Sequence, residues 1–431
     1  MKKFLFLLFF VIHFFGGFAA TRTQSEKIAI AQSVLQSFSN NGTRTTQLGL
    51  KTYKENAAIT VLGYEQGGYV VIANDNSYRA VIAYSELPFR EDNPGLNWWL
   101  KSVSQMMSSE QAATVQGEET SMVAKTAIPQ LMVSEWGQEA PFNNLCPTGK
   151  YGKCPTGCVA TAMAQVLYYH KSPQKAIGKG SCTYGGKTYA QNLSGVNYAW
   201  DKMQPKYDTP SGEGCEDVAT LLYDCGLSIG MNYDDQGSGA YNFEASTAFK
   251  KHFSLYSTFY DRSYYTATEW MNLVYEQLSN NNPVVYGGVS EVDGQQSGHS
   301  FVIDGYQEDG LVHVNWGWNG QGNGYYDIAL LNPVVGDSMS FSNQQDMVVC
   351  QTNPFEVYSR IGMRGITIKK VDETSISVAV SQIVNLLPDD FKGELAIVAE
   401  KNGKKKIISS VSERLVYGIS YSSFFTRLVI L

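Results

Sequence analysis

Cys158 has the setting that a thiol nucleophile needs. It directly follows Gly157 and opens a run, residues 160–169, that contains no Gly or Pro and carries small and apolar residues at helical spacing. The run predicts a buried helix with Cys158 in its first turn. Because unpaired N–H groups and the positive end of the helix dipole favour an anion there, we expect the pKa of Cys158 to be lowered. Taken alone, however, Cys158 is better explained as a small core residue, since buried cysteines are common.

A histidine and an asparagine far downstream change that interpretation. His299 precedes an apolar, β-prone segment, and Asn315 lies in a segment that alternates apolar and polar residues. The dipeptide Asp304-Gly305 predicts a bend between two strands, which brings His299 and Asn315 side by side in a hairpin. A thiol nucleophile requires a base that takes its proton and a third group that holds the base in one tautomer and orientation. Cys158, His299 and Asn315 supply nucleophile, base and orienting group in that order.

His313 is the one rival for the role of base. The chain has five histidines. His13 lies in the N-terminal apolar segment, His170 ends the predicted helix, and His252 follows two lysines. Since His313 lies two residues from Asn315 on the same predicted hairpin, the spacing does not exclude it.

With these residues the chain resembles the streptopain family of papain-like cysteine peptidases, which are secreted bacterial endopeptidases made as zymogens. The resemblance covers about residue 25 to about residue 355 and rests on separated motifs whose order and context are specific. The motifs are Trp136-Gly137-Gln138, Pro141-Phe142-Asn143, Gly157-Cys158-Val159-Ala160, Gly298-His299-Ser300-Phe301 and Val314-Asn315-Trp316-Gly317-Trp318. The resemblance implies that Cys158 is the nucleophile, His299 the base and Gln138 a donor to the oxyanion hole. It also implies that Asn315 and Trp316 flank and orient the histidine, and which of them matters more stays open.

The fold class that the resemblance implies is α+β, with a papain-like peptidase of two lobes. A helical lobe carries the Cys158 helix, a twisted antiparallel sheet carries His299, and the cleft lies between them. We divide the chain into a signal peptide (1–20), an inhibitory α+β propeptide (21–125), a cysteine peptidase domain (126–355) and a β-rich C-terminal module (356–431). At about 75 residues this module is short for a β-sandwich and is expected to be a partial one.

The first 20 residues have the pattern of a secretory signal. A basic start, Lys2-Lys3, precedes a short apolar run and small residues that fit cleavage after Ala19 or Ala20. A membrane anchor is the weaker interpretation, because the run is shorter than the ~20 residues of a spanning helix and contains a histidine. No later stretch is long and apolar enough to span a bilayer. We therefore expect an exported chain that is secreted, on the cell surface or periplasmic.

Residues 21–125 read as a small unit without a catalytic group. A periodic helix from Ser25, strands at 58–64, 69–73 and 80–84 and a helix at 95–107 are expected. The polar linker 110–125 carries no aromatic residue and is expected to be exposed and open to proteolysis. The family resemblance makes this unit the inhibitory propeptide, through Gly67-Gly68-Tyr69-Val70-Val71 and Ala83-Tyr84-Ser85. The alternative is an accessory binding module.

Charge and cysteine content limit the partners. The net charge of −7 and a pI near 5.4 argue against nucleic acid or an anionic membrane as a partner. The expected partners are protein or peptide substrates and the chain's own propeptide. Seven cysteines leave at least one thiol free. Cys146, Cys154 and Cys158 lack the paired spacing of a zinc site, so we expect no metal and no cofactor, and a Cys146–Cys154 disulfide stays open.

The glycine-rich loop 230–240 carries Gly-x-Gly, but it lacks the strand-then-helix frame of a nucleotide site. A loop beside bound peptide is the better interpretation, and an ordinary surface loop is the alternative.

The sequence thus predicts a secreted cysteine endopeptidase, made as a latent zymogen, that acts through a thioester on Cys158. Two other classes stay open, namely an amidase or acyltransferase with the same Cys-His site, and a catalytically silent surface adhesin. An open cleft rather than a narrow pocket would separate a peptidase from the first, and labelling by a thiol-directed inhibitor would separate it from the second.

Overall fold

The computed structural model describes residues 21–39, 49–108, 125–265, 267–292, 295–328, 330, 344–354, 361–372, 375–385, 391–401, 404–415 and 420–430. The predicted signal peptide, nearly all of the polar linker 110–125 and the dipeptide Asn402-Gly403, which is typical of hairpin turns, lie outside these residues. Within the described ranges, every helix is too short or too polar to cross a membrane.

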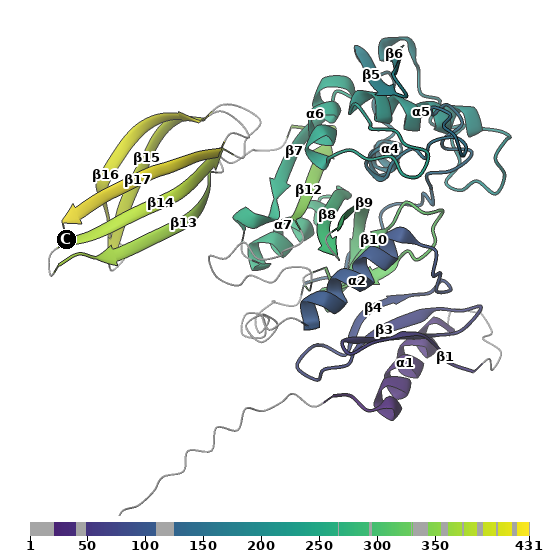
Figure 1. Cartoon of the computed structure of the whole chain (residues 1–431), viewed down its shortest axis with the longest axis horizontal. Helices are drawn as coiled ribbons and strands as arrows, with labels where there is room; N and C mark the ends of the chain where they lie inside the picture. The colour runs from purple at the N-terminus through teal and green to yellow at the C-terminus, as the bar shows by residue number, and fades with distance from the viewer. Residues whose placement is uncertain are drawn as a thin grey trace, which may run out of the picture.

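A ten-stranded antiparallel sheet runs through most of the molecule (Figure 1). In order across the sheet its strands are β1 (Lys51–Glu55), β2 (Ile59–Gly63), β3 (Tyr69–Ala73), β4 (Val81–Ser85), β11 (Gly324–Tyr326), β10 (Val312–Asn315), β9 (Gln295–Tyr306), β8 (Val284–Val292), β12 (Gln344–Gln351) and β7 (Tyr256–Asp261). The pairing of β4 with β11, which places Tyr84 opposite Tyr325, joins the N-terminal unit to the rest of the sheet. The predicted strands at 58–64, 69–73 and 80–84 are therefore present, but they belong to one sheet that includes the strand of His299.

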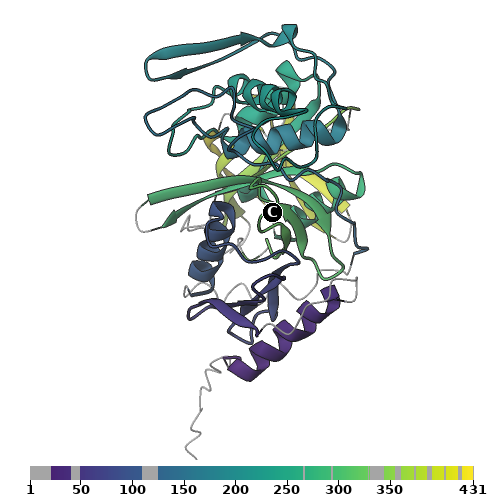
Figure 2. The ribbon, with the colours of Figure 1, turned by 90° about the vertical axis from the view of Figure 1, so that its right-hand side faces the viewer.

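Helices cover both faces of the sheet (Figure 2). They are α1 (Gln24–Ser39), α2 (Pro94–Ser108), α4 (Cys158–His170), α5 (Cys215–Ser228), α6 (Asn242–His252) and α7 (Ala267–Ser279), with a hairpin β5 (Lys179–Tyr184)–β6 (Lys187–Asn192) and two short 3-10 helices, η2 (Leu193–Gly195) and η3 (Arg262–Tyr264). Because side chains alternate along a strand, Phe301 packs in the core with α2 and α7, whereas its neighbour Val302 packs in the core with α4, α5 and α6. The helical lobe thus lies on one face and α2 of the N-terminal unit on the other, which confirms the predicted α+β fold.

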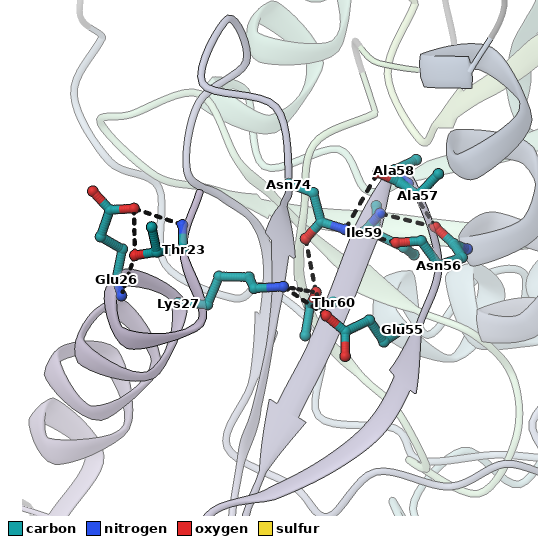
Figure 3. A network of polar contacts seen from close by, with 10 residues as sticks. All are labelled: Thr23, Glu26, Lys27, Glu55, Asn56, Ala57, Ala58, Ile59, Thr60 and Asn74. Atoms are coloured by element: carbon teal, nitrogen blue, oxygen red, sulfur yellow. Dashed lines mark hydrogen bonds and ion pairs between the residues drawn. The ribbon is translucent and has the colours of Figure 1, made fainter. Parts of the chain in front are cut away.

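A polar network fastens α1 to the strands of the N-terminal unit (Figure 3). The buried ammonium of Lys27 donates to Glu55 Oε1 at 2.6 Å and to Thr60 Oγ1 at 3.0 Å. Thr60 in turn donates to Asn74 Oδ1 at 2.7 Å. Since an unpaired buried charge is costly, these contacts specify how α1 sits on β1 and β2. At the start of α1, Glu26 accepts from the backbone N–H of Thr23.

The C-terminal module consists of two small sheets beside the peptidase part (Figure 1). One contains β13 (Ile361–Lys370), β14 (Ser375–Asn385) and β17 (Ser420–Ile430), and the other contains β15 (Phe391–Lys401) and β16 (Lys404–Leu415). Val380, Ile383, Leu395 and Leu415 form a core between the sheets. The β-rich module predicted after residue 355 is therefore present.

Candidate active site

Cys158 is the first residue of α4, as the sequence predicts. The residue before it, Gly157, has φ 86° and ψ 140°, a conformation that side chains rarely adopt. A Cβ atom at Gly157 would lie 2.6 Å from the methyl carbon of Met231 and 3.2 Å from the carbonyl oxygen of Ser238. Only glycine therefore brings the chain into α4 at this point, and the glycine-rich loop 230–240 packs directly against the turn that carries the thiol.

Cys158 is partly exposed as a residue, but its thiol is enclosed and faces backbone N–H groups. Burial raises the pKa of Cys158, while the N–H groups of Ser300, Val159 and Cys158 itself act in the opposite direction. The expected lowering of this pKa is therefore wrong for this arrangement of the chain. The helix N-terminus contributes as expected, but burial outweighs it and no imidazolium lies among the groups that stabilise the thiolate.

His299 lies on β9, and its ring is 8% exposed. Its Nε2 lies 2.9 Å from the carbonyl oxygen of Trp316. Because a carbonyl only accepts, Nε2 carries the hydrogen and Nδ1 keeps the lone pair that a base needs. Burial lowers the pKa of His299 to about 4, against a smaller opposite effect of the Trp316 carbonyl, so the ring is neutral at pH 7. The indole of Trp318 stacks on the ring with a centroid distance of 6.4 Å.

Helix α2 of the N-terminal unit packs against His299. A Cβ atom at Gly95 would lie 2.7 Å from both Cδ2 and Nε2 of His299, so the helix backbone touches the ring. Beside it, the indole of Trp98 covers Gly288, which lies opposite His299 on β8. The candidate base is thus enclosed between its own sheet and a helix from the other end of the chain.

The side chain of Asn315 does not hold the imidazole directly in this structure. Its Nδ2 donates to the carbonyl oxygen of Ser134 at 2.6 Å and to Gln165 Oε1 at 3.1 Å, and its Oδ1 accepts from the N–H of Gly317 at 3.1 Å. Asn315 therefore shapes the turn after β10 and ties it to α4. It is the main-chain carbonyl of Trp316 that meets His299, and the Trp316 N–H is held by Asn323 Oδ1 at 3.0 Å. No motif in the sequence distinguishes Asn323.

Gln138 lies in the segment that packs beside the start of α4. The side chain of Gln138 is buried, and its main-chain carbonyl oxygen accepts from the N–H of Thr156 at 3.1 Å. A Cβ atom at Gly137 would lie 2.6 Å from the side chain of Asn319, so glycine is required for this close approach. The backbone of Gln138 is therefore bonded to Thr156, which directly precedes the Gly157–Cys158 turn, so Gln138 lies beside the start of α4.

His313 has a different partner. Its Nδ1 lies 2.6 Å from Asp304 Oδ1, and Asp304 Oδ2 accepts from the N–H of Met132 at 2.9 Å. Asp304 and Gly305 do not form the predicted bend. They lie within β9, where Gly305 pairs with His313 and Ile303 with Val314, so Asp304 is the extra residue of a β-bulge. The bulge directs Asp304 to His313 and to the entry of the peptidase domain.

Among the described residues no cluster of three or more His, Cys, Asp or Glu side chains could hold a metal ion. All seven cysteines are free thiols, including Cys146 and Cys154.

Comparison with known proteins places these features in a family. The profile of the Peptidase C10 family matches residues 136–326. The chain is 31% identical over 316 residues to the thiol protease/hemagglutinin PrtT of Porphyromonas gingivalis. The matched region covers 66% of this chain and 36% of PrtT. It is 27% identical over 319 residues to streptopain of Streptococcus pyogenes, covering 67% of this chain and 79% of streptopain. A solved fragment of Prevotella intermedia prointerpain A is similar with a TM-score of 0.62 at 36% identity, covering 70% of this chain and 97% of the fragment.

A thiol at the start of a lobe-spanning helix, with a histidine on the facing sheet, is the arrangement of papain-like cysteine peptidases. The chain belongs to the Peptidase C10 family, and streptopain is one of its relatives. The family membership predicted from the motifs is thereby confirmed. The chain spans about a third, 36%, of the length of PrtT.

Proposed function

We propose that this chain is an exported cysteine endopeptidase made as a latent zymogen, with Cys158 as nucleophile and His299 as base. The observation that carries the proposal is the position of Cys158 at the N-terminus of α4, with the N–H of the residue after His299 facing its sulfur. The strand that carries His299 thus runs past the nucleophile, although the two residues are 141 positions apart (299 − 158).

The residues divide the reaction between them. The sulfur of Cys158 attacks a peptide carbonyl carbon, and the oxyanion accepts hydrogen bonds from the N–H of Cys158 and the amide of Gln138. Nδ1 of His299 takes the thiol proton and delivers it to the departing amine. A water molecule then hydrolyses the thioester with the same ring as base. The Trp316 carbonyl keeps the hydrogen of His299 on Nε2, and Asn315 supports the turn that presents this carbonyl.

Latency is supported by the packing of the N-terminal unit. Gly95 and Trp98 of α2 lie on the face of the sheet where His299 is held, whereas the Cys158 helix packs against the opposite face. Removal of residues 21 to about 125 would release His299 to approach the thiol.

The contacts of Lys125 and Ile128 favour proteolytic cleavage before Lys125. Lys125 Nζ lies over the ring of Tyr275, 4.3 Å from its centroid, and contacts Asn272 on α7. Ile128 pairs with Tyr306 on β9 in both directions, at 2.7 and 2.9 Å. Because these residues are held by the peptidase part, proteolytic cleavage is expected on the N-terminal side of Lys125, in the later part of the polar linker 110–125.

The test uses Cys158→Ala in the full chain. This variant should be folded, remain unprocessed and fail to hydrolyse casein, because loss of one sulfur leaves only a small cavity. Cys146→Ala, which removes another buried thiol of the same lobe, is the control and should keep activity. Hydrolysis by Cys158→Ala at a rate comparable to that of the unmodified enzyme would refute the assignment. N-terminal sequencing of the active species would identify the scission site, and an active species that still begins near Thr21 would make the N-terminal unit an accessory module.

A further inference from the structure

A row of residues across the sheet passes directly beside the candidate base. Ser300 on β9 lies opposite Gly287 on β8, Gly287 lies opposite Asp346 on β12, and Asp346 lies opposite Asp261 on β7. Since side chains alternate, this row faces the helical lobe, whereas His299 faces α2. The glycine in the middle leaves a gap in the row. A Cβ atom at Gly287 would lie 2.3 Å from Nδ2 of Asn242 and 3.2 Å from Oδ1 of Asp346.

Asn242, the first residue of α6, fills the gap and connects the two sides of the row. Its Nδ2 donates to Asp346 Oδ1 at 2.7 Å, and its Oδ1 accepts from the hydroxyl of Ser300 at 2.8 Å. Asn242 is 5% exposed and Ser300 is 4% exposed, so water competes little for these bonds. Burial raises the pKa of Asp346 to about 7, while its hydrogen bond with Asn242 acts in the opposite direction. In its ionised form the carboxylate only accepts, so Asp346 turns the amide of Asn242 so that the amide oxygen faces Ser300.

The main chain of Ser300 faces the other way, towards the nucleophile. β10 ends at Asn315, opposite Val302, so the strand ladder on that side of β9 does not reach Ser300. The N–H of Ser300 contacts the sulfur of Cys158 instead, and it favours the thiolate. The side chain of Ser300 is therefore held by Asn242. Its N–H lies beyond the last residue pair of β9 and β10 and faces the thiol.

We infer that Asn242 is a positioning residue for the nucleophile: it holds Ser300 so that the Ser300 N–H points at the Cys158 sulfur, and Asp346 fixes the orientation of the Asn242 amide. Neither side chain touches substrate, and both act through Ser300. The inference rests on the proposed function, because it takes Cys158 as the reacting thiol.

The test measures the thiol itself in the full chain. Ser300→Ala removes the hydrogen bond from Ser300 to Asn242 with little change in volume. Asp346→Asn replaces a carboxylate with an amide of the same size that can both donate and accept, so residue 346 no longer fixes which way the Asn242 amide faces. The rate of iodoacetamide alkylation of Cys158 is followed against pH by mass spectrometry of its peptide. Both variants should raise the apparent pKa of Cys158 and lower alkylation at neutral pH roughly threefold to tenfold, since each pKa unit is a factor of ten in thiolate. Ser257→Ala is the matched control. It removes a bond from β7 to Ser246 of α6 and leaves Ser300 untouched, so its profile should equal that of the unmodified chain.

The processed enzymes then separate positioning from general packing. In Ser300→Ala and Asp346→Asn, kcat should fall roughly threefold to tenfold with KM unchanged, because the nucleophile and not substrate binding is altered. Profiles and kcat values equal to those of the unmodified enzyme, or an equal change in Ser257→Ala, would overturn the inference. If one variant does not fold, as judged by its thermal midpoint, the other decides. An unmodified enzyme in which Cys158 is no more reactive than the buried thiols would instead refute the proposed function.

Discussion

Replacement of Gly95 by alanine should make the precursor less latent. The added Cβ atom would lie 2.7 Å from Cδ2 and Nε2 of His299 and 2.8 Å from Cε3 of Trp316, well inside the 3.4 Å at which ordinary contact begins. His299 and Trp316 are buried and Trp316 is held by two hydrogen bonds from its own N–H groups, so α2 is the part that must move. Overpacking of this kind costs about 1–3 kcal/mol.

A penalty of that size acts on the equilibrium between docked and undocked α2. It corresponds to about a 5- to 150-fold rise in the undocked population, in which His299 is released. The initial rate of peptide hydrolysis by unprocessed Gly95→Ala precursor should rise by the same factor, measured with a fluorogenic peptide while gel electrophoresis shows that the chain is intact. Gly49→Ala is the control, since a Cβ atom at Gly49 meets no atom within 4 Å. An initial rate for Gly95→Ala equal to that of Gly49→Ala would refute the view that α2 restrains His299.

Three further outcomes are expected. Gln138→Ala should lower kcat about a hundredfold with little change in KM, because an oxyanion donor acts mainly on the transition state, and unchanged turnover in steady-state kinetics would leave Gln138 a structural residue. Acid should destabilise the precursor: the pKa of His299 is lowered from 6.5 to about 4, so the unfolded chain binds the proton first and stability is lost as pH falls from 6.5 through 4. That loss is at most about 3 kcal/mol and is measured as the thermal midpoint of inactive Cys158→Ala precursor, with His299→Gln added as the comparison that should lose less. His313→Ala should lower the thermal midpoint, since it removes the imidazole that pairs with the buried Asp304 carboxylate. A His313→Ala variant that has normal stability but no peptidase activity would restore His313 as a candidate base.

Local patterns in the sequence predicted the elements that carry the reactive groups. The Gly157–Cys158 turn and the apolar run after it correctly predicted α4, and the helices predicted from Ser25 and at 95–107 agree with α1 and α2 within a few residues. The strand of His299 was also predicted. These elements are defined by neighbours in the sequence, so periodicity and turn residues are sufficient to find them.

Features that depend on distant pairing were missed. The polar hairpin β5–β6 has no apolar run that would mark it, and nothing local indicates that β4 pairs with β11. Alternation shows which residues share a face, but it does not show which strand lies alongside. For the same reason the partner of His313 was not foreseen, since Asp304-Gly305 has the composition of a turn and instead forms a bulge.

The predicted pKa of Cys158 failed for a related reason. The helix N-terminus is visible in the sequence, whereas the burial that outweighs it comes from distant segments: Ser300 of β9 faces the thiol, and the loop 230–240 packs on Gly157 beside it. The role expected of Asn315 also depended on three-dimensional detail, because the main chain of Trp316 takes the place beside His299 and the Asn315 amide turns towards Ser134.

The junction between β4 and β11 has a consequence for the aggregation behaviour of the processed protein. Loss of the N-terminal unit would leave β11 as an outer strand, and an unpaired strand edge is a template for adding other chains. β11 is only three residues long and begins with Gly324. The newly opened edge therefore offers few free N–H and C=O groups, while loss of Tyr69 and Trp99 uncovers part of the ring of Tyr326. Activation would therefore uncover a strand edge that is too short to act as a template for intermolecular β-sheets. The pairing of β4 with β11 can thus be broken without opening a long unpaired edge.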